Sequence, residues 1–355
     1  MTLPVQALRS ATYELADALA VNEFYQQQGW TDGLPIVPPT EERVWATLQA
    51  AGLAPGDVVG VERVRQRPIT AEKVAVNTVM AGCLPAYMPV VVATLRAMCQ
   101  EPFNLHGSSA STGGSAPFIV VNGPVRTAIG MNATHNVLAN GNRANATIGR
   151  AVRLVLINVL GCIPGQLDRS TLGHPGKFTF CIAEDEEDSP WTPLAQERGV
   201  AVGVSAVTVM ACEAPRQVMN EWTHHPEEIL ETFAAEMRHN MLTYSVWSGN
   251  YVLIIPKQLR ELLVAAGWHK RDIREYIYRS ARVLRRDWAT VGKANIVNRS
   301  GGPNQEFTAL RAPEDLLVVA AGGPAGGFGA VIPPWLGSKA QAITQAIDLP
   351  TVEKG

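Results

Sequence analysis

The stretch FIVVNGP at residues 118–124 decides the fold class. Its first four residues form a short apolar run, which is typical of a strand buried on both faces, and Asn-Gly-Pro ends the run in a turn. Polar residues from Asn142 onward then open a helix that we expect from about residue 144 to residue 159. A buried strand followed by a helix predicts an α/β fold.

Short apolar runs alternate with helical stretches along the rest of the chain. They lie at residues 178–182, 202–210, 251–255 and 315–320. This alternation predicts a sheet of short buried strands covered by helices on both faces. The run LVVAAGGP at 317–324 ends in Gly-Pro like the run at 118–124, so two similar halves are one option.

The domain organisation has two alternatives. Pro190-Trp191-Thr192-Pro193 interrupts the pattern, which predicts a boundary near residue 200. The N-terminal α/β region (1–200) would then contain the amide-rich helix start, and the C-terminal α/β region (201–355) would contain a Gly-rich terminal loop. The other alternative is a single domain, since 355 residues are enough for one large core.

The composition excludes several classes of protein. Thirty Lys and Arg against 32 Asp and Glu give a net charge of −2, which argues against nucleic acid or an anionic membrane surface as the main partner. A hydrophobic content of 46% excludes a disordered chain. Five cysteines without a CxxC pair, and no signal-like apolar stretch at the N-terminus, indicate a cytoplasmic protein. We also expect a homo-oligomer.

One charge-free segment between Lys73 and Arg96 is long enough to span a membrane. Pro85 and Pro89 lie inside it, and prolines would break a single spanning helix. Two buried helices joined near Gly82 fit this segment better, so we expect no membrane partner.

An amide-rich helix start is the first candidate site. Free backbone N–H groups at a helix start favour an anion, and an arginine adds a charge that matches carboxylate or phosphate. We therefore expect substrate binding by Asn142, Arg143, Asn145 and Thr147. The alternative is a capping cluster, in which the asparagines satisfy the backbone of the helix start.

The second candidate is the loop at residues 106–115, which is rich in serine and glycine. His106 is a candidate general acid or base, and Ser108 and Ser109 are candidate substrate ligands. The alternative is a flexible surface connection.

Three isolated residues complete the candidates. Cys83 lies at a break between two apolar helices and is a candidate nucleophile, although free cysteine is more often a small buried hydrophobe. Glu184 follows a strand and is a candidate acid or base if it is desolvated. Lys177 is a candidate anion ligand.

No metal or cofactor motif is evident. Glu221-x-x-His224 and Glu236-x-x-His239 have a spacing found in metal sites, but they lie 15 residues apart, on the order of 20 Å on one helix. The Gly-rich loop at 322–329 lacks the GxGxxG spacing of a dinucleotide site. We therefore expect neither a metal nor a cofactor.

Several motifs together resemble a family of bacterial proteins of similar length that has no established activity. These motifs include DGLPIVPPT at 32–40, NTVMAGCLPAYMPVVV at 77–92 and GNRANATIGRAVRLVL at 141–156. The resemblance covers most of the chain and implies one architecture, together with a loose association with (seleno)proteins named for a selenocysteine-Gly-Ser-Cys motif. This chain lacks a Cys-Gly-Ser-Cys string, so any thiol or selenol partnership would need another polypeptide. The resemblance assigns no catalytic residue.

These features predict an enzyme that acts on a small organic anion by thiol or acid–base chemistry, of the hydrolase or lyase type. In this hypothesis Cys83, His106 and Arg143 face a common hollow. One alternative is an oxidoreductase component that works with a separate thiol or selenol protein. Another is a non-catalytic binding or scaffold subunit.

Overall fold

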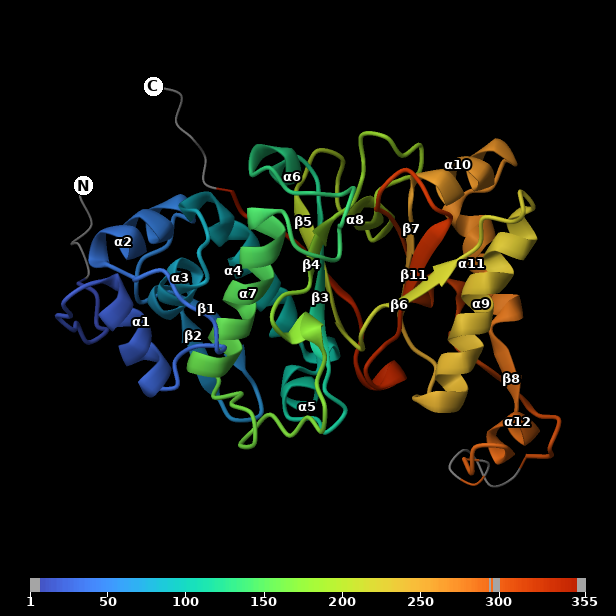
Figure 1. The fold of residues 1–355 in the computed structure, drawn as a ribbon, viewed down its shortest axis with the longest axis horizontal. Coiled ribbons are helices and arrows are strands. Elements are labelled where there is room, and N and C mark those ends of the chain that lie inside the picture. The colour runs from blue at the N-terminus through green and yellow to red at the C-terminus, as the bar shows by residue number, and fades with distance from the viewer. Residues whose placement is uncertain (1–6, 294, 296–300, 350–355) are drawn as a thin grey trace.

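The computed structural model describes residues 7–293, 295 and 301–349. Its centre is a pair of four-stranded mixed sheets that lie face to face, with helices on the two outer faces (Figure 1). The prediction of an α/β fold is confirmed. Helices cover both outer faces, but two sheets lie between them, because the inner face of each sheet is buried by the other sheet.

The strands of each sheet come from distant parts of the chain. The first sheet has the order β12–β5–β3–β4, with β3 (Ala116–Asn122), β4 (Cys181–Ala183), β5 (Ala206–Cys212) and β12 (Ile343–Ala346). The second sheet has the order β10–β7–β11–β6, with β6 (Arg216–Met219), β7 (Tyr251–Ile255), β10 (Leu316–Ala320) and β11 (Phe328–Ile332). All residues of β3, β5, β7 and β10 except Pro117 are buried, as expected for strands covered on both faces.

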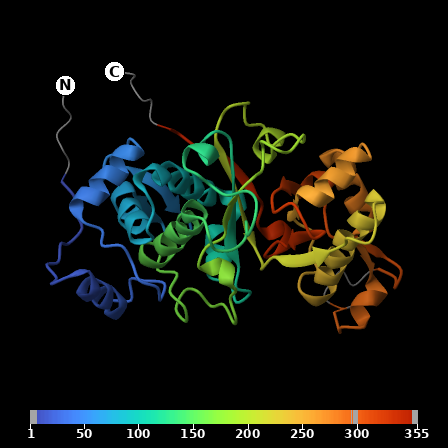
Figure 2. The ribbon, with the colours of Figure 1, turned by 45° about the horizontal axis from the view of Figure 1, so that its top comes forward.

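Helices pack on the outer face of each sheet. The first sheet is covered by α4 (Met88–Met98) and α7 (Arg143–Asn158), with α3 (Ala71–Met80) and α2 (Glu41–Ala50) packed outside them. The second sheet is covered by α9 (Pro226–Thr243), α10 (Lys257–Ala265) and α11 (Lys270–Ser280). The N-terminal and C-terminal helices therefore lie at opposite ends of the molecule, with the sheets between them (Figure 2).

The remaining elements are short and lie at the edges. They are α1 (Ala18–Gln27), β1 (Val58–Glu62), β2 (Arg67–Thr70), α5 (Leu105–Ser109), α6 (Val125–Ala128), α8 (Leu194–Glu197), β8 (Arg282–Leu284), α12 (Arg285–Ala289) and β9 (Glu306–Thr308). The charge-free segment forms the helices α3 and α4 with a break between them, as predicted. Within the described ranges, no helix combines the length and the apolar character that crossing a membrane requires.

The two sheets share one pattern of strand directions. β3 runs parallel to β4 and antiparallel to β5, which runs antiparallel to β12. In the same way, β7 runs parallel to β10 and antiparallel to β11, which runs antiparallel to β6. The pairs Val121–Ala183 and Ile255–Ala320 end the two parallel ladders at corresponding places. The core of the protein therefore consists of two similar halves.

The chain crosses between the sheets twice. β5 of the first sheet leads into β6 of the second, and β11 of the second sheet leads into β12 of the first. Each sheet is thus completed by a strand whose predecessor lies in the other sheet. The two sheets do not correspond to the regions 1–200 and 201–355, because β5 and β12 lie beyond residue 200 and belong to the first sheet.

Candidate functional site

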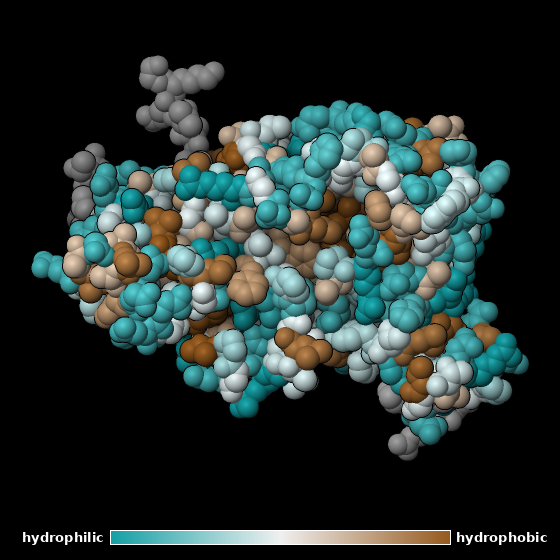
Figure 3. Space-filling model, in the orientation of Figure 1, coloured by the Kyte–Doolittle hydropathy of each residue, from teal (hydrophilic) through white to brown (hydrophobic). Residues whose placement is uncertain are grey.

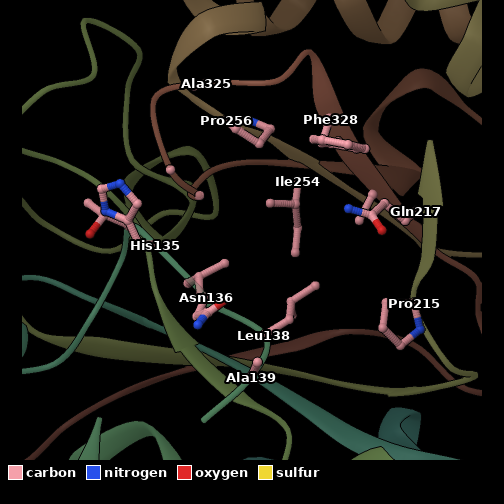
Figure 4. Close-up of a pocket in the computed structure, with 16 residues that line it drawn as sticks. His135, Asn136, Leu138, Ala139, Pro215, Gln217, Ile254, Pro256, Ala325 and Phe328 are labelled. Carbon is pink, nitrogen blue, oxygen red and sulfur yellow. The ribbon is translucent and has the colours of Figure 1, made fainter. Parts of the chain in front are cut away.

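A cavity of about 640 Å³ lies over part of the inner face of the second sheet (Figure 4). Its floor is formed by β7, β11 and β6 through Ile254, Ala330 and Gln217. One wall is the loop at 134–139, which follows α6, and the other is the glycine-rich turn at 322–329. We call this cavity the cleft.

The cleft is lined mainly by apolar groups. Its polar side chains are those of Thr134, His135, Asn136 and Gln217. None of the sixteen lining residues is Lys, Arg, Asp or Glu, so His135 is the one side chain of the acid–base type among them. A hollow with apolar residues at its base is visible in the middle of Figure 3.

The start of α7 holds the loop that carries His135. The Asn145 side chain accepts a hydrogen bond from the Asn132 N–H (3.0 Å) and donates one to the Asn132 carbonyl (2.8 Å). The Asn132 side chain accepts from the Thr134 N–H (2.9 Å) and donates to the His135 carbonyl (2.7 Å). Asn142 caps α7 by accepting from the Asn145 N–H (3.0 Å). Asn142 and Asn145 are therefore capping and positioning residues, and the geometry does not support the prediction that they bind substrate.

Close backbone contacts bring the two walls together. Asn136 has φ +54°, in the left-handed region that asparagine tolerates better than most residues. Gly322 has φ +114°, and a Cβ at this position would lie 2.7 Å from Cγ of Pro256. The Gly322 N–H donates to the carbonyl of Ala133 (2.8 Å), which joins the turn to the loop. Glycine is therefore required where the turn borders the cleft.

The corresponding surface of the first sheet is covered by α8. The ladders align the floor residues Ile254, Ala330 and Gln217 with Val120, Thr208 and Thr344, respectively. Leu194 lies on the side of Val120, Thr208 and Thr344 and is fully buried between the sheets. Arg198 donates from Nε to Oγ1 of Thr344 (2.5 Å). The connection from β4 to β5 spans 184–205, whereas that from β10 to β11 spans only 321–327. Among the residues that the structure describes, the second half therefore has no counterpart of α8 over the cleft.

Cys83 and Arg143 lie together, but outside the cleft. The Nε of Arg143 donates to the Gly82 carbonyl (2.9 Å), and the Thr147 hydroxyl donates to the Arg143 carbonyl (2.8 Å). Burial raises the pKa of the Cys83 thiol to about 12, although a hydrogen bond with Thr147 and the charge of Arg143 act to lower it. A thiol with such a pKa is a poor nucleophile at neutral pH, which argues against the catalytic role predicted for Cys83.

His106 lies near the opposite end of α7. Its loop contacts the region after that helix, where Ser109 is hydrogen-bonded to Cys162. His106 Nδ1 is 3.8 Å from Oε1 of the buried Glu62. The Ser108 and Ser109 hydroxyls donate to carbonyls of their own short helix, α5, at 3.2 Å each. His106 therefore does not share a hollow with Cys83 and Arg143, and the serines are not free to bind a substrate.

Lys177 forms an internal ion cluster. Its ammonium group donates to both oxygens of Asp168 (2.9 and 2.6 Å) and to the Ser170 hydroxyl (2.5 Å). Arg153 also donates to Asp168 (2.7 Å), and these donors hold the pKa of the Asp168 carboxyl well below its usual range despite burial. All three donors of Lys177 are used, so the geometry does not support the predicted role as an anion ligand.

Glu184 is a buried structural carboxylate. It is 1% exposed and accepts hydrogen bonds from Asn122 Nδ2 (2.7 Å), the Leu194 N–H (2.7 Å) and Lys270 Nζ (2.8 Å). Asn122 belongs to β3 and Lys270 to α11, so this carboxylate ties the two halves together. Its lone pairs are occupied, which argues against the predicted role in acid–base catalysis.

Sequence reasoning did not single out His135. One signal was present, because residues 131–142 contain four asparagines together with Thr134 and His135. This composition marks a loop rich in side-chain hydrogen bonds. Among the described residues, no three His, Cys, Asp or Glu side chains converge in an arrangement suited to a metal ion.

A carboxyl group lies where the two crossings of the chain meet. Glu213 follows β5, and its N–H donates to the Pro333 carbonyl of the other crossing (3.0 Å). Burial raises the pKa of Glu213 from 4.5 to about 7, although a hydrogen bond with Tyr244 and the charges of Arg216 and Lys177 act to lower it. Glu213 is therefore protonated in the folded chain at pH values where it is ionised in the unfolded chain.

We predict that Glu213→Gln flattens the pH dependence of stability. The contribution of Glu213 is fully present below its unfolded pKa and is lost as the pH rises through about 7. The free energy of unfolding of the wild type should therefore fall by on the order of 2–3 kcal/mol relative to Glu213→Gln between about pH 5 and pH 8. Urea unfolding measures this difference. The exposed Glu275→Gln variant should follow the wild type, and a parallel curve for Glu213→Gln would contradict the assignment.

No protein-family model matches the chain, and no curated protein matches it. The cleft is therefore a candidate functional site on its geometry alone.

Proposed function

We propose that the protein binds a small, mainly apolar organic molecule in the cleft and acts on it by acid–base chemistry of the hydrolase or lyase type. One observation carries this proposal. The second sheet leaves open, beside His135, a surface that the first sheet covers with α8. Two similar halves that differ at this place point to a function for the opening.

The lining favours an uncharged ligand over the anion expected from the sequence. A carboxylate in a largely apolar cavity needs a cationic partner, and burying it without one is costly. No Lys or Arg is among the sixteen lining residues, and Arg143 lies elsewhere. Binding sites for small molecules are typically apolar cavities with a few well-placed polar groups, which describes the cleft.

His135 is the residue that supports proton transfer. It is exposed at the rim of the cleft, and a Cβ on Gly323 of the opposite wall would lie only 3.2 Å from its Cδ2. A histidine in such a position can take a proton from a bound molecule or from a water beside it, and then return the proton. The hydrogen bond from Asn132 to the His135 carbonyl fixes the backbone from which the ring projects.

The alternatives differ from this proposal in what they require. An oxidoreductase component with a thiol partner needs a reactive cysteine, and the raised pKa of Cys83 speaks against one there. A non-catalytic binding subunit would use the same cleft without turnover. All five cysteines are free thiols, which fits the cytoplasmic location that we include in the proposal.

We predict that Ala330→Leu blocks ligand binding without unfolding the protein. Ala330 lies on the cleft floor, and the larger side chain would occupy the space of a ligand. Small uncharged fragments that bind the wild type in ligand-observed NMR should lose at least about tenfold in affinity. The exposed Ala265→Leu on α10 is the matched control, and Gln217→Trp fills the same cleft from an exposed strand position. Fragments that bind all four proteins equally would show that the cleft is not the site.

We further predict that His135→Gln removes hydrolytic activity. The test reaction is the hydrolysis of N-(4-nitrophenyl)-2-methylpropanamide, a small branched amide. Loss of a general base should lower the rate by about 10²–10⁴-fold. His224→Gln, at an exposed position outside the cleft lining, should keep the wild-type rate. A wild type no faster than buffer, or a fully active His135→Gln, would rule out the catalytic part of the proposal.

A further inference from the structure

We propose that the ligand of the cleft combines a short branched apolar body with a neutral N–H donor group of the amide or ureido type, which it presents to β6. This inference rests on the proposed function and specifies its ligand class. It comes from the other half of the molecule, where a segment of the chain itself occupies the corresponding place.

The segment around α8 shows what this kind of surface binds. Leu194 supplies a branched apolar side chain, which is fully buried between the sheets. Arg198 supplies two N–H donors to the edge strand β12 and the residue just before it. Its Nε donates to Oγ1 of Thr344 (2.5 Å), and its Nη2 donates to the carbonyl of Ala342 (2.8 Å). The first sheet is thus covered by an apolar group and a donor pair.

The strand pairing identifies the residues of the cleft that correspond to Thr344 and Ala342. Thr208 pairs with Thr344, and in the second sheet Ala330 pairs with Gln217. Gln217 therefore takes the place of Thr344, and Pro215, two residues earlier, takes the place of Ala342. Both Gln217 and Pro215 line the cleft, at the side formed by β6.

The groups on β6 offer hydrogen-bond acceptors to a ligand. Pro215 has no N–H, so its carbonyl is its one polar backbone group, and it can only accept. Gln217 provides an amide oxygen as a second acceptor. Within the described ranges, no hydrogen bond reaches the Gln217 side chain or the Pro215 carbonyl. A donor group on the ligand would satisfy both.

The apolar body of the ligand follows from the floor of the cleft. Ile254 and Ala330 align with Val120 and Thr208, which lie beneath the segment that contains Leu194 and Arg198. A branched chain of about the size of a leucine side chain would cover Ile254 and Ala330. Because no Asp or Glu lines the cleft, a neutral donor fits it better than a cation does. Because no Lys or Arg lines it, an anionic head has no cationic partner there.

Three probes with the same branched apolar body test the effect of the N–H donor and the effect of a negative charge separately. They are 3-methylbutanamide, which has an N–H donor, methyl 3-methylbutanoate, which is neutral and has none, and 3-methylbutanoate, which is anionic. Their affinities for the full chain are measured by ligand-observed NMR. We expect the amide to bind at least about tenfold more tightly than the ester and the acid, because an unpaired acceptor is costly.

Two variants locate and test the contact. In Gln217→Leu the advantage of the amide over the ester should fall to about twofold or less, whereas the exposed Gln49→Leu on α2 should keep it. Ala330→Leu should weaken all three probes if they bind in the cleft. An ester or acid that binds as tightly as the amide, with binding lost in Ala330→Leu, overturns this inference and leaves the proposed function standing. No binding of any probe to the wild type overturns both.

Discussion

The contact between two apolar sheet faces is the interaction on which the rest of the structure depends. Phe118 and Met210 of the first sheet lie in one core with Ile254 and Val319 of the second. The chain enters β6 of the second sheet from β5 of the first, and it enters β12 of the first sheet from β11 of the second. Neither sheet is therefore complete without the other. The buried carboxylate of Glu184 adds a polar tie, and removing one partner of such a buried pair typically costs about 3–5 kcal/mol.

The cleft exists because one connection differs in length between two otherwise similar halves. Both sheets end their parallel ladders at corresponding residues, and in both the chain then returns to an antiparallel strand. In the first half the connection is long, and α8 folds back over the sheet with Leu194 beneath it. In the second half the connection is a short glycine-rich turn, so part of the apolar inner face stays open. The loop carrying His135 borders this opening from the first half, which makes the site a property of the whole molecule.

Much of the fold could be predicted from the sequence, because strands buried on both faces are continuous apolar runs and helix starts carry capping residues. The start of α7 at Arg143 and the break between α3 and α4 both agree with the prediction. An apolar run does not reveal whether a helix or a second sheet covers it, so the double sheet could not be foreseen. The hypothesis that Cys83, His106 and Arg143 face a common hollow is not supported, for a related reason. His106 and Arg143 lie at opposite ends of α7, a 16-residue helix about 24 Å long, and no local pattern encodes that separation.

The most direct test of the account is to map where 3-methylbutanamide binds, using backbone amide chemical shifts of the isotope-labelled protein. The open half should respond alone, with shifts confined to the loop at 134–139, β6 and the region 322–330. The segment 189–205, which covers the corresponding surface in the other half, should not respond. Shifts centred on that segment, or near Cys83 and Arg143, would contradict the assignment of the cleft as the functional site.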